Sequence, residues 1–264
     1  MSDYVSLGVV AKAFPAKLVR QILCQTGKES VRERALPAHV VVYYVVALAL
    51  YMQVSCREVL RCLLEGLEWL SKPGLNVHVA GRSGISQARG RLGAEPMMRL
   101  HDAVVSPVAA KRTRGAWYKG RRLVSLDGST LDVADTRANE QAFGRPGASR
   151  GSSAYPQIRF VSLVENGTHV LFGSRWEVET SLDELKTHLR GSKIVLRSKT
   201  PELVRQEFYG LMMAHFAVRG LMHEAAIAAD VDPDQLSFVH AVRVIRRKLP
   251  LFVAIPPSQE KSIS

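Results

Sequence analysis

An uninterrupted apolar run, VVVYYVVALALYM, occupies residues 40–52 and limits how this chain can fold. Its 13 residues fall short of the roughly 20 that a helix needs to cross a bilayer. Pro37 stands just before the run and suits the first turn of a helix, where its missing N–H costs little. The run therefore predicts a helix in the protein core that carries residues 41–51.

A second helix is predicted directly after this run. Ser55 and Glu58 have the spacing of a capping box, in which each side chain satisfies a backbone N–H of the first turn. Apolar residues then recur at helical spacing until Pro73 and Gly74 end the pattern. These residues are Val59, Leu60, Leu63, Leu64, Leu67 and Leu70. Two successive helices with apolar faces indicate a small helical bundle.

The charge balance favours a polyanionic partner, although an acidic membrane surface is an alternative. The chain has 36 Lys and Arg against 24 Asp and Glu, which gives a net charge of +12 and a pI near 9.9. At this level nucleic acid is the leading hypothesis. Residues 81–93 predict a short helix with Ser83 as a possible N-cap. Arg89 and Arg91 on this helix are candidates for contact with DNA phosphates, and a solvated charged face is the alternative.

The rest of the front half offers one more helix and a boundary. Residues 97–110 predict a helix, and the basic cluster at residues 111–115 predicts a linker between two domains.

The three cysteines have neither metal-ligand spacing nor an even count, so a reducing cytoplasm fits them best. They are Cys24, Cys56 and Cys62. The N-terminus lacks the pattern of a signal peptide.

The segment RRLVSLDGST, residues 121–130, predicts a buried strand that delivers a carboxylate at its end. Asp127 follows the apolar part of the strand, and Gly128 marks the place where the chain is expected to turn. Asp127 then either opens that turn or serves as a functional acid. A second strand is predicted over residues 130–134, followed by a long loop over residues 135–156.

The back half continues with a hairpin and several helices. Residues 158–164 and 168–172 predict strands joined by an Asn-Gly turn. Apolar spacing predicts a helix over residues 174–190, with Glu179 and Lys186 on another of its faces. Further helices are predicted from residue 200 and from residue 232 to about residue 247, with a frayed tail from residue 256. The histidines on these helices lack ligands at metal spacing; they are His215, His223 and His240.

In this order the pieces resemble the insertion-sequence-four family of bacterial transposases, over nearly the whole chain. The apolar helix and the later SQARGRLG resemble that family's N-terminal domain. LDGSTLDVADTRAN at residues 126–139, followed by FGRPG at residues 143–147, is similar to the start of its catalytic domain. Arg175, Glu179 and Lys186 match the spacing of its signature of Tyr, Arg, Glu and Lys, with Phe172 at the tyrosine position.

The resemblance implies an α+β chain with three parts. A helical, basic N-terminal domain would cover residues 1–115. A truncated RNase H-like catalytic domain of the DDE type, with antiparallel strands followed by helices, would cover residues 116–255, and residues 256–264 would form a flexible tail. The expected partners are DNA, as element ends and target, and other copies of the chain in a homo-oligomer, with no membrane association.

The same resemblance assigns roles to individual residues. Asp127 and Glu179 would be the first and last metal-binding acids, with Mg²⁺ or Mn²⁺ as the expected cofactor. Arg175 and Lys186 would lie near the DNA backbone. In this chemistry two ions about 3.5–4 Å apart activate a water or a DNA 3′-hydroxyl and stabilise the leaving oxygen, and hard cations of this kind take oxygen ligands.

The sequence departs from the family in one respect. The family's second aspartate, and the insertion that precedes its glutamate helix, have no counterpart between Asp127 and Glu179, which indicates an internal deletion. The sequence therefore predicts a catalytically impaired transposase, with a non-catalytic DNA-binding remnant or regulator of transposition as the alternative. The acids that might replace the missing one are Asp132, Asp135 and Glu165. Loss of a neighbouring strand also predicts an open sheet edge that favours self-association.

Overall fold

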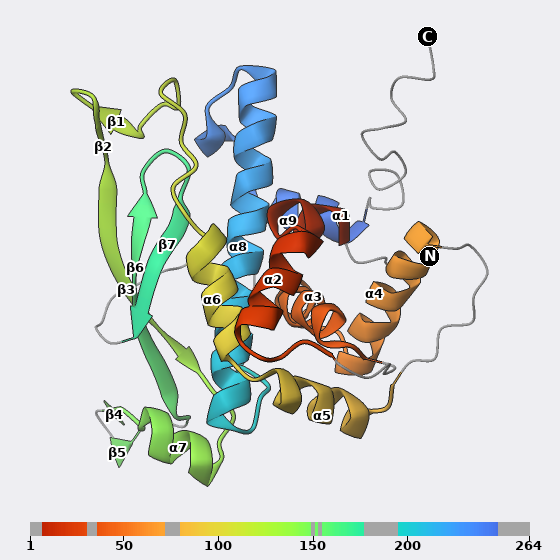
Figure 1. Cartoon of the computed structure of the whole chain (residues 1–264). Helices are drawn as coiled ribbons and strands as arrows, with labels where there is room; N and C mark the ends of the chain where they lie inside the picture. Colours follow the sequence, from red (N-terminus) through yellow and green to blue (C-terminus); the bar gives the residue numbers. More distant parts are fainter. Residues whose placement is uncertain are drawn as a thin grey trace.

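A computed structural model of the chain describes residues 7–30, 36–71, 80–148, 151–152, 155–176 and 195–247. Helices gather on one side of the molecule and a small antiparallel sheet lies on the other, with the long helix α8 (Pro201–Ala229) between them (Figure 1). Within the described ranges, no helix has the length and apolar character needed to span a membrane. The mixed α+β architecture expected from the sequence is confirmed in this coarse form.

The front half is helical, as predicted. The apolar run forms α3, whose residues from Val40 to Leu50 are all buried. Pro37 stands at the N-cap of α3, so the predicted core helix is confirmed. The helices among the described residues of this half are α1 (Leu7–Ala13), α2 (Ala16–Gln25), α3 (Ala38–Leu50), α4 (Cys56–Ser71), α5 (Arg82–Leu92) and α6 (Glu95–Val104).

The ends of these helices differ from the prediction in three places. The hydroxyl of Ser55 accepts the backbone N–H of Glu58 at 3.2 Å, as a capping box requires, but the Glu58 carboxylate pairs with Arg61 instead of returning to Ser55. Helix α5 begins at Arg82 with Gly81 as its N-cap, so Ser83 lies inside the helix and its assignment as a cap was wrong. Helix α6 ends at Val104 instead of residue 110, because Pro107 disfavours helical backbone before it.

The sheet has the order β3-β6-β7 and is antiparallel throughout, with β3 (Val124–Asp132), β6 (Gln157–Glu165) and β7 (Val170–Trp176). The predicted turn at Gly128 is wrong. Strand β3 continues through that position, since β6 pairs with all nine of its residues and Gly128 lies opposite Val161. The predicted hairpin between β6 and β7 is confirmed, and β7 extends four residues beyond the predicted end at residue 172.

Residues 135–156 do not form one loop, contrary to the prediction. They contain α7 (Arg137–Phe143), whose N-cap Thr136 accepts the backbone N–H of Asn139 at 3.2 Å. Capping of this kind favours helix formation. Two short strand pairs complete the description: β1 (Trp117–Tyr118) with β2 (Arg121–Arg122), and β4 (Gly147–Ala148) with β5 (Gly151–Ser152).

Helix α8 joins the sheet to the helical half. Phe160 of β6 packs edge-on against Phe208 of α8, with ring centroids 5.1 Å apart. On its other side α8 approaches α3 closely at Gly210, where an added Cβ would lie 2.8 Å from the carbonyl oxygen of Val45. The predicted final helix is divided in two, because Asp232 caps the short 3-10 helix η2 (Pro233–Gln235) before α9 (Phe238–Arg247) begins.

Candidate functional site around Asp127

Asp127 lies in the middle of β3, at the boundary between a buried face and an unpaired edge. Its position on the strand places it on the same face as Ser129 and Leu131, which are buried. Across the ladder it lies opposite Ser162, which is also buried. Asp127 itself is half-buried. The strand therefore holds the acid beside the core while leaving it accessible to solvent.

The edge of β3 that faces away from β6 is open over most of its length in the part of the chain that the structure describes. Val133 donates its N–H to Pro156 on the β6 side, whereas the carbonyl of Asp132 accepts the N–H of Leu196 on the opposite side, both at 2.9 Å. Because backbone groups alternate in direction along a strand, every second residue presents its polar groups to this edge. These residues are Val124, Leu126, Gly128 and Thr130.

The carboxylate of Asp127 reaches this open edge. Its Oδ1 accepts the backbone N–H of Gly128 at 2.8 Å. The acid therefore satisfies one backbone N–H of this edge and places its negative charge beside it. This is where the structure positions the first acid predicted from the sequence.

The acids considered as replacements are occupied elsewhere. Asp132 accepts the side-chain amide of Gln157 at 2.7 Å, and Asp135 pairs with Arg145 at 2.6 Å. Glu165 is fully buried. It accepts the backbone N–H groups of Val108 and Ala109 and the hydroxyl of Thr168, and it pairs with Arg122.

A metal site does not come together from the residues that the structure describes. Among them no three His, Cys, Asp or Glu side chains form a group that could hold a metal ion. Asp127 is the acid of the predicted pair that is described, and Glu179 lies outside the described residues. Because Glu179 is not among the described residues, the predicted pair of acids stays a prediction, and no catalytic step is derived through a metal.

Arg89, predicted to contact DNA, is buried and forms hydrogen bonds inside the protein. It is 7% exposed, and its guanidinium donates to Gln206 at 2.7 Å and to Ser198 and the carbonyl of Leu203 at 3.0 Å each. It fastens α5 to the beginning of α8 and is not available to a phosphate in this arrangement. Arg91, two residues along the same helix, is exposed.

The remaining predicted DNA contacts are only partly described. Arg175 lies on β7 opposite Val161 and not on a helix, contrary to the expectation that a helix begins at residue 174. Its side chain and all of Lys186 lie outside the described residues. The DNA contacts expected of Arg175 and Lys186 therefore stay predictions.

A feature that the sequence reading missed lies immediately before β3. The stretch predicted as a basic linker, residues 111–115, is followed by a two-stranded hairpin, β1 and β2, joined by Lys119 and Gly120. Both turn residues have positive φ, at 47° and 75°. The two-residue turn ending in glycine, flanked by aromatic and basic residues, was the available signal.

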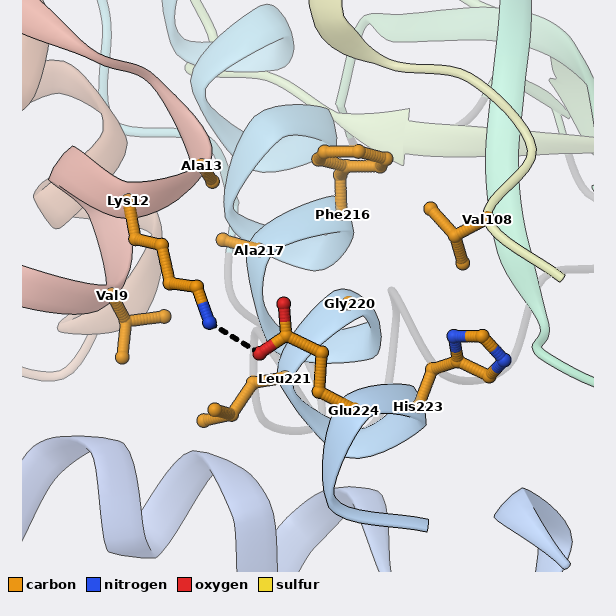
Figure 2. Close-up of a pocket in the computed structure, with 10 residues that line it drawn as sticks. All are labelled: Val9, Lys12, Ala13, Val108, Phe216, Ala217, Gly220, Leu221, His223 and Glu224. Atoms are coloured by element: carbon orange, nitrogen blue, oxygen red, sulfur yellow. Dashed lines mark hydrogen bonds and ion pairs between the residues drawn. The ribbon is translucent and has the colours of Figure 1, made fainter. Parts of the chain in front are cut away.

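A cavity of about 350 Å³ lies between α1 and α8 (Figure 2). Most of its lining is apolar, with Phe216 and Leu221 among the side chains that face it. Lys12 and Glu224 form an ion pair of 2.5 Å across part of it. The polar groups of the cavity are thus largely used internally, and the cavity does not include Asp127.

Comparisons with known proteins show that the front half is similar to a known family of N-terminal domains. Residues 4–102 match the family model described as insertion element 4 transposase N-terminal. The chain is 29% identical over 172 residues to the transposase InsG for insertion sequence element IS4 of Escherichia coli K12, covering 64% of this chain and 37% of that protein. It is 27% identical over 170 residues to the putative transposase InsZ of the same strain, covering 64% and 54% respectively.

The matched regions therefore span between about a third and about half of these curated relatives. No solved structure matches the chain.

Proposed function

We propose that this chain, whose residues 4–102 match the insertion element 4 transposase N-terminal model and which is similar to InsG and InsZ, binds DNA as a transposase of this family whose catalytic site is incomplete. The observation that carries the proposal is this match of residues 4–102. Asp127, a half-buried acid on β3, is the residue to which the family resemblance assigns the first catalytic role. The match to InsG covers 37% of that protein. That this chain shares the activity of a whole transposase is therefore proposed here.

DNA binding is supported by charge. The net charge of +12 favours association with the polyanionic backbone of nucleic acid, whose release of counterions dominates affinity. The exposed Arg91 on α5 is a further candidate for phosphate contact. Arg175 and Lys186 remain candidates from the family signature, for duplex DNA lying near Asp127.

The catalytic half of the proposal concerns an RNase H-like domain. Strands β3, β6 and β7, covered on one face by α8, would be its beginning, and Asp127 and Glu179 would be its first and last acids. Mg²⁺ or Mn²⁺, when bound by a complete set of acids, activates the attacking oxygen in such enzymes. The 52 positions from Asp127 to Glu179 hold no counterpart of the family's second aspartate, which we attribute to an internal deletion that impairs catalysis.

A second candidate function is a non-catalytic DNA-binding regulator of transposition. It is favoured by the state of the alternative acids, since Asp132, Asp135 and Glu165 are each engaged by other side chains and none lies free beside Asp127 in the described structure. A protein that occupied element ends without cutting them would compete with an active transposase.

The two candidates are tested with a supercoiled plasmid that carries the element's ends, incubated with the full chain and Mg²⁺ or Mn²⁺. Retarded plasmid without nicking or strand transfer is the expected result. Efficient strand transfer that disappears in Asp127→Ala would show that the site is catalytically complete and would overturn the proposed impairment. If the protein neither retards nor cuts the plasmid, the proposal that it binds DNA is overturned.

A further inference from the structure

The segment between Asp102 and Asp127 has an unusual charge. Over these 24 residues the chain has no acid and six basic residues: Lys111, Arg112, Arg114, Lys119, Arg121 and Arg122. The segment therefore carries a net charge equal to half of the chain's +12, and it lies just before the strand that carries Asp127. Clustered positive charge of this kind raises the local concentration of polyanions.

The segment has a defined shape. β1 and β2 pair through Trp117 with Arg122 and through Tyr118 with Arg121, and the intervening Lys119 and Gly120 both have positive φ. Two such residues are typical of the type I′ turn of a tight hairpin. Figure 1 shows this hairpin at the end of the sheet that lies away from α7.

The base of the hairpin is fixed to the rest of the protein. The indole N–H of Trp117 donates to the carbonyl of Ala110 at 2.8 Å, and the hydroxyl of Thr113 hydrogen-bonds with Nε2 of His223 on α8 at 2.8 Å. Arg122 pairs with the buried Glu165 and stacks over Trp117, with its guanidinium carbon 4.6 Å from the ring centroid. Arg122 therefore acts inside the protein, and the ribbon above it is held in place.

The other five basic residues of the segment are exposed: Lys111, Arg112, Arg114, Lys119 and Arg121. None of them forms a salt bridge with another residue of the described structure. At the tip, Tyr118 is 62% exposed and the ammonium of Lys119 lies 5.4 Å from its ring centroid. The structure thus presents hydrated cations and an aromatic ring on an anchored ribbon.

We propose that residues 111–122 form a DNA-contacting ribbon that binds the phosphate backbone of duplex DNA. The inference rests on the proposed function and identifies where the DNA is held. A two-stranded ribbon fits the major groove of B-DNA, and phosphate contacts of Lys and Arg fix the position of a protein on the duplex. Arg121 precedes Asp127 by six residues of extended chain, roughly 20 Å, so a duplex on the ribbon reaches the open edge of β3.

The test compares two double variants of the full chain by fluorescence anisotropy with a labelled duplex of random sequence. In the ribbon, Lys119→Asn with Arg121→Gln removes two charges, and Asn tolerates the positive φ at this turn. The matched control, Lys17→Gln with Arg20→Gln, removes two exposed charges from α2. The ribbon variant should bind about tenfold more weakly or worse, and its log–log salt slope should be smaller by about 2. The control should stay within about twofold of wild type.

A second ribbon variant, Arg112→Gln with Arg114→Gln, leaves the turn intact and should weaken binding in the same way. Circular dichroism of each variant verifies that the fold persists. If wild type binds and the ribbon variants lose no more affinity than the control, the ribbon is not the contact surface and the proposed function still stands. If wild type does not bind duplex DNA at all, the proposed function fails and the inference fails with it.

Discussion

The carboxylate of Asp127 accepts the backbone N–H of Gly128 at 2.8 Å, on the edge of β3 that β6 does not occupy. The acid therefore has a local structural role in addition to the catalytic role implied by the family resemblance. This bond satisfies one backbone N–H at the sheet edge.

The two roles of Asp127 are separated by Asp127→Asn. The amide oxygen of Asn can accept the same bond, so the free energy of unfolding should change by less than about 1 kcal/mol. Affinity for DNA should stay equal or rise slightly, because a negative charge near phosphates is removed. Chemical denaturation and anisotropy measure the two quantities. A large loss of DNA affinity in this variant would contradict the assignment of Asp127 to an impaired catalytic site.

Replacement of Arg89 should destabilise the protein much more than replacement of Arg91, although both residues lie on α5. Arg89→Ala leaves the buried polar groups of Gln206 and Ser198 without their charged partner, which should cost about 2–4 kcal/mol of stability. Arg91→Ala should change stability by less than about 0.5 kcal/mol. Thermal or urea denaturation of both variants measures the difference. Equal stabilities would show that the interior contacts of Arg89 contribute little.

The edge of β3 that has no partner strand over most of its length among the described residues predicts self-association. Leu126 is 74% exposed on this strand, and unpaired edges with apolar side chains favour pairing with another chain. Wild type should sediment above the monomer mass at micromolar concentration, and Leu126→Lys should shift it toward the monomer. Val231→Lys, which charges an exposed apolar residue after α8, is the matched control. A wild-type chain that stays monomeric under these conditions would rule out this edge as an interface.

His223 should make stability depend on pH. Burial lowers its pKa below the ordinary 6.5, an effect that Glu224 partly opposes and Arg112 increases. The unfolded chain therefore takes up a proton at His223 more readily, so the stability that this residue contributes is present above pH 6.5 and is lost as pH falls below it.

The expected readout is the free energy of unfolding at a pH of about 7.5 and of about 5.5, which lie on either side of an ordinary histidine pKa. The loss on acidification should be smaller in His223→Gln than in wild type, since Gln can still bond to Thr113 but does not titrate. If His223→Gln loses as much unfolding free energy on acidification as wild type does, groups other than His223 cause the acid sensitivity.

Much of the helical half was predictable because its signals are local. The apolar run before Tyr51 predicts a core helix, and Ser55 marks the beginning of the next helix. The sheet was less predictable at Gly128, where glycine normally indicates a turn. Pairing with β6 decides the conformation there, and such a partner, about 33 residues away in the sequence, leaves no local signal.

The surroundings of the candidate site were less predictable, because they depend on residues that are distant in the sequence. The strand that carries Asp127 was predictable from its local pattern, although Asp127 lies within that strand and not at its end. Sequence spacing cannot show that the guanidinium of Arg89 is enclosed by α8. The hairpin at Lys119 was hidden by its composition, because a run of basic residues resembles a linker. Its anchoring depends on Glu165 and His223, which come from distant parts of the chain.

The central claim, that this chain holds duplex DNA through exposed cations, is tested most directly by the affinity of the wild-type protein for a duplex over about 50 to 200 mM salt. Five exposed cations on the ribbon predict a straight log–log plot with a slope of about −4.5. A slope near zero, or no binding at the lowest salt concentration, would contradict the account.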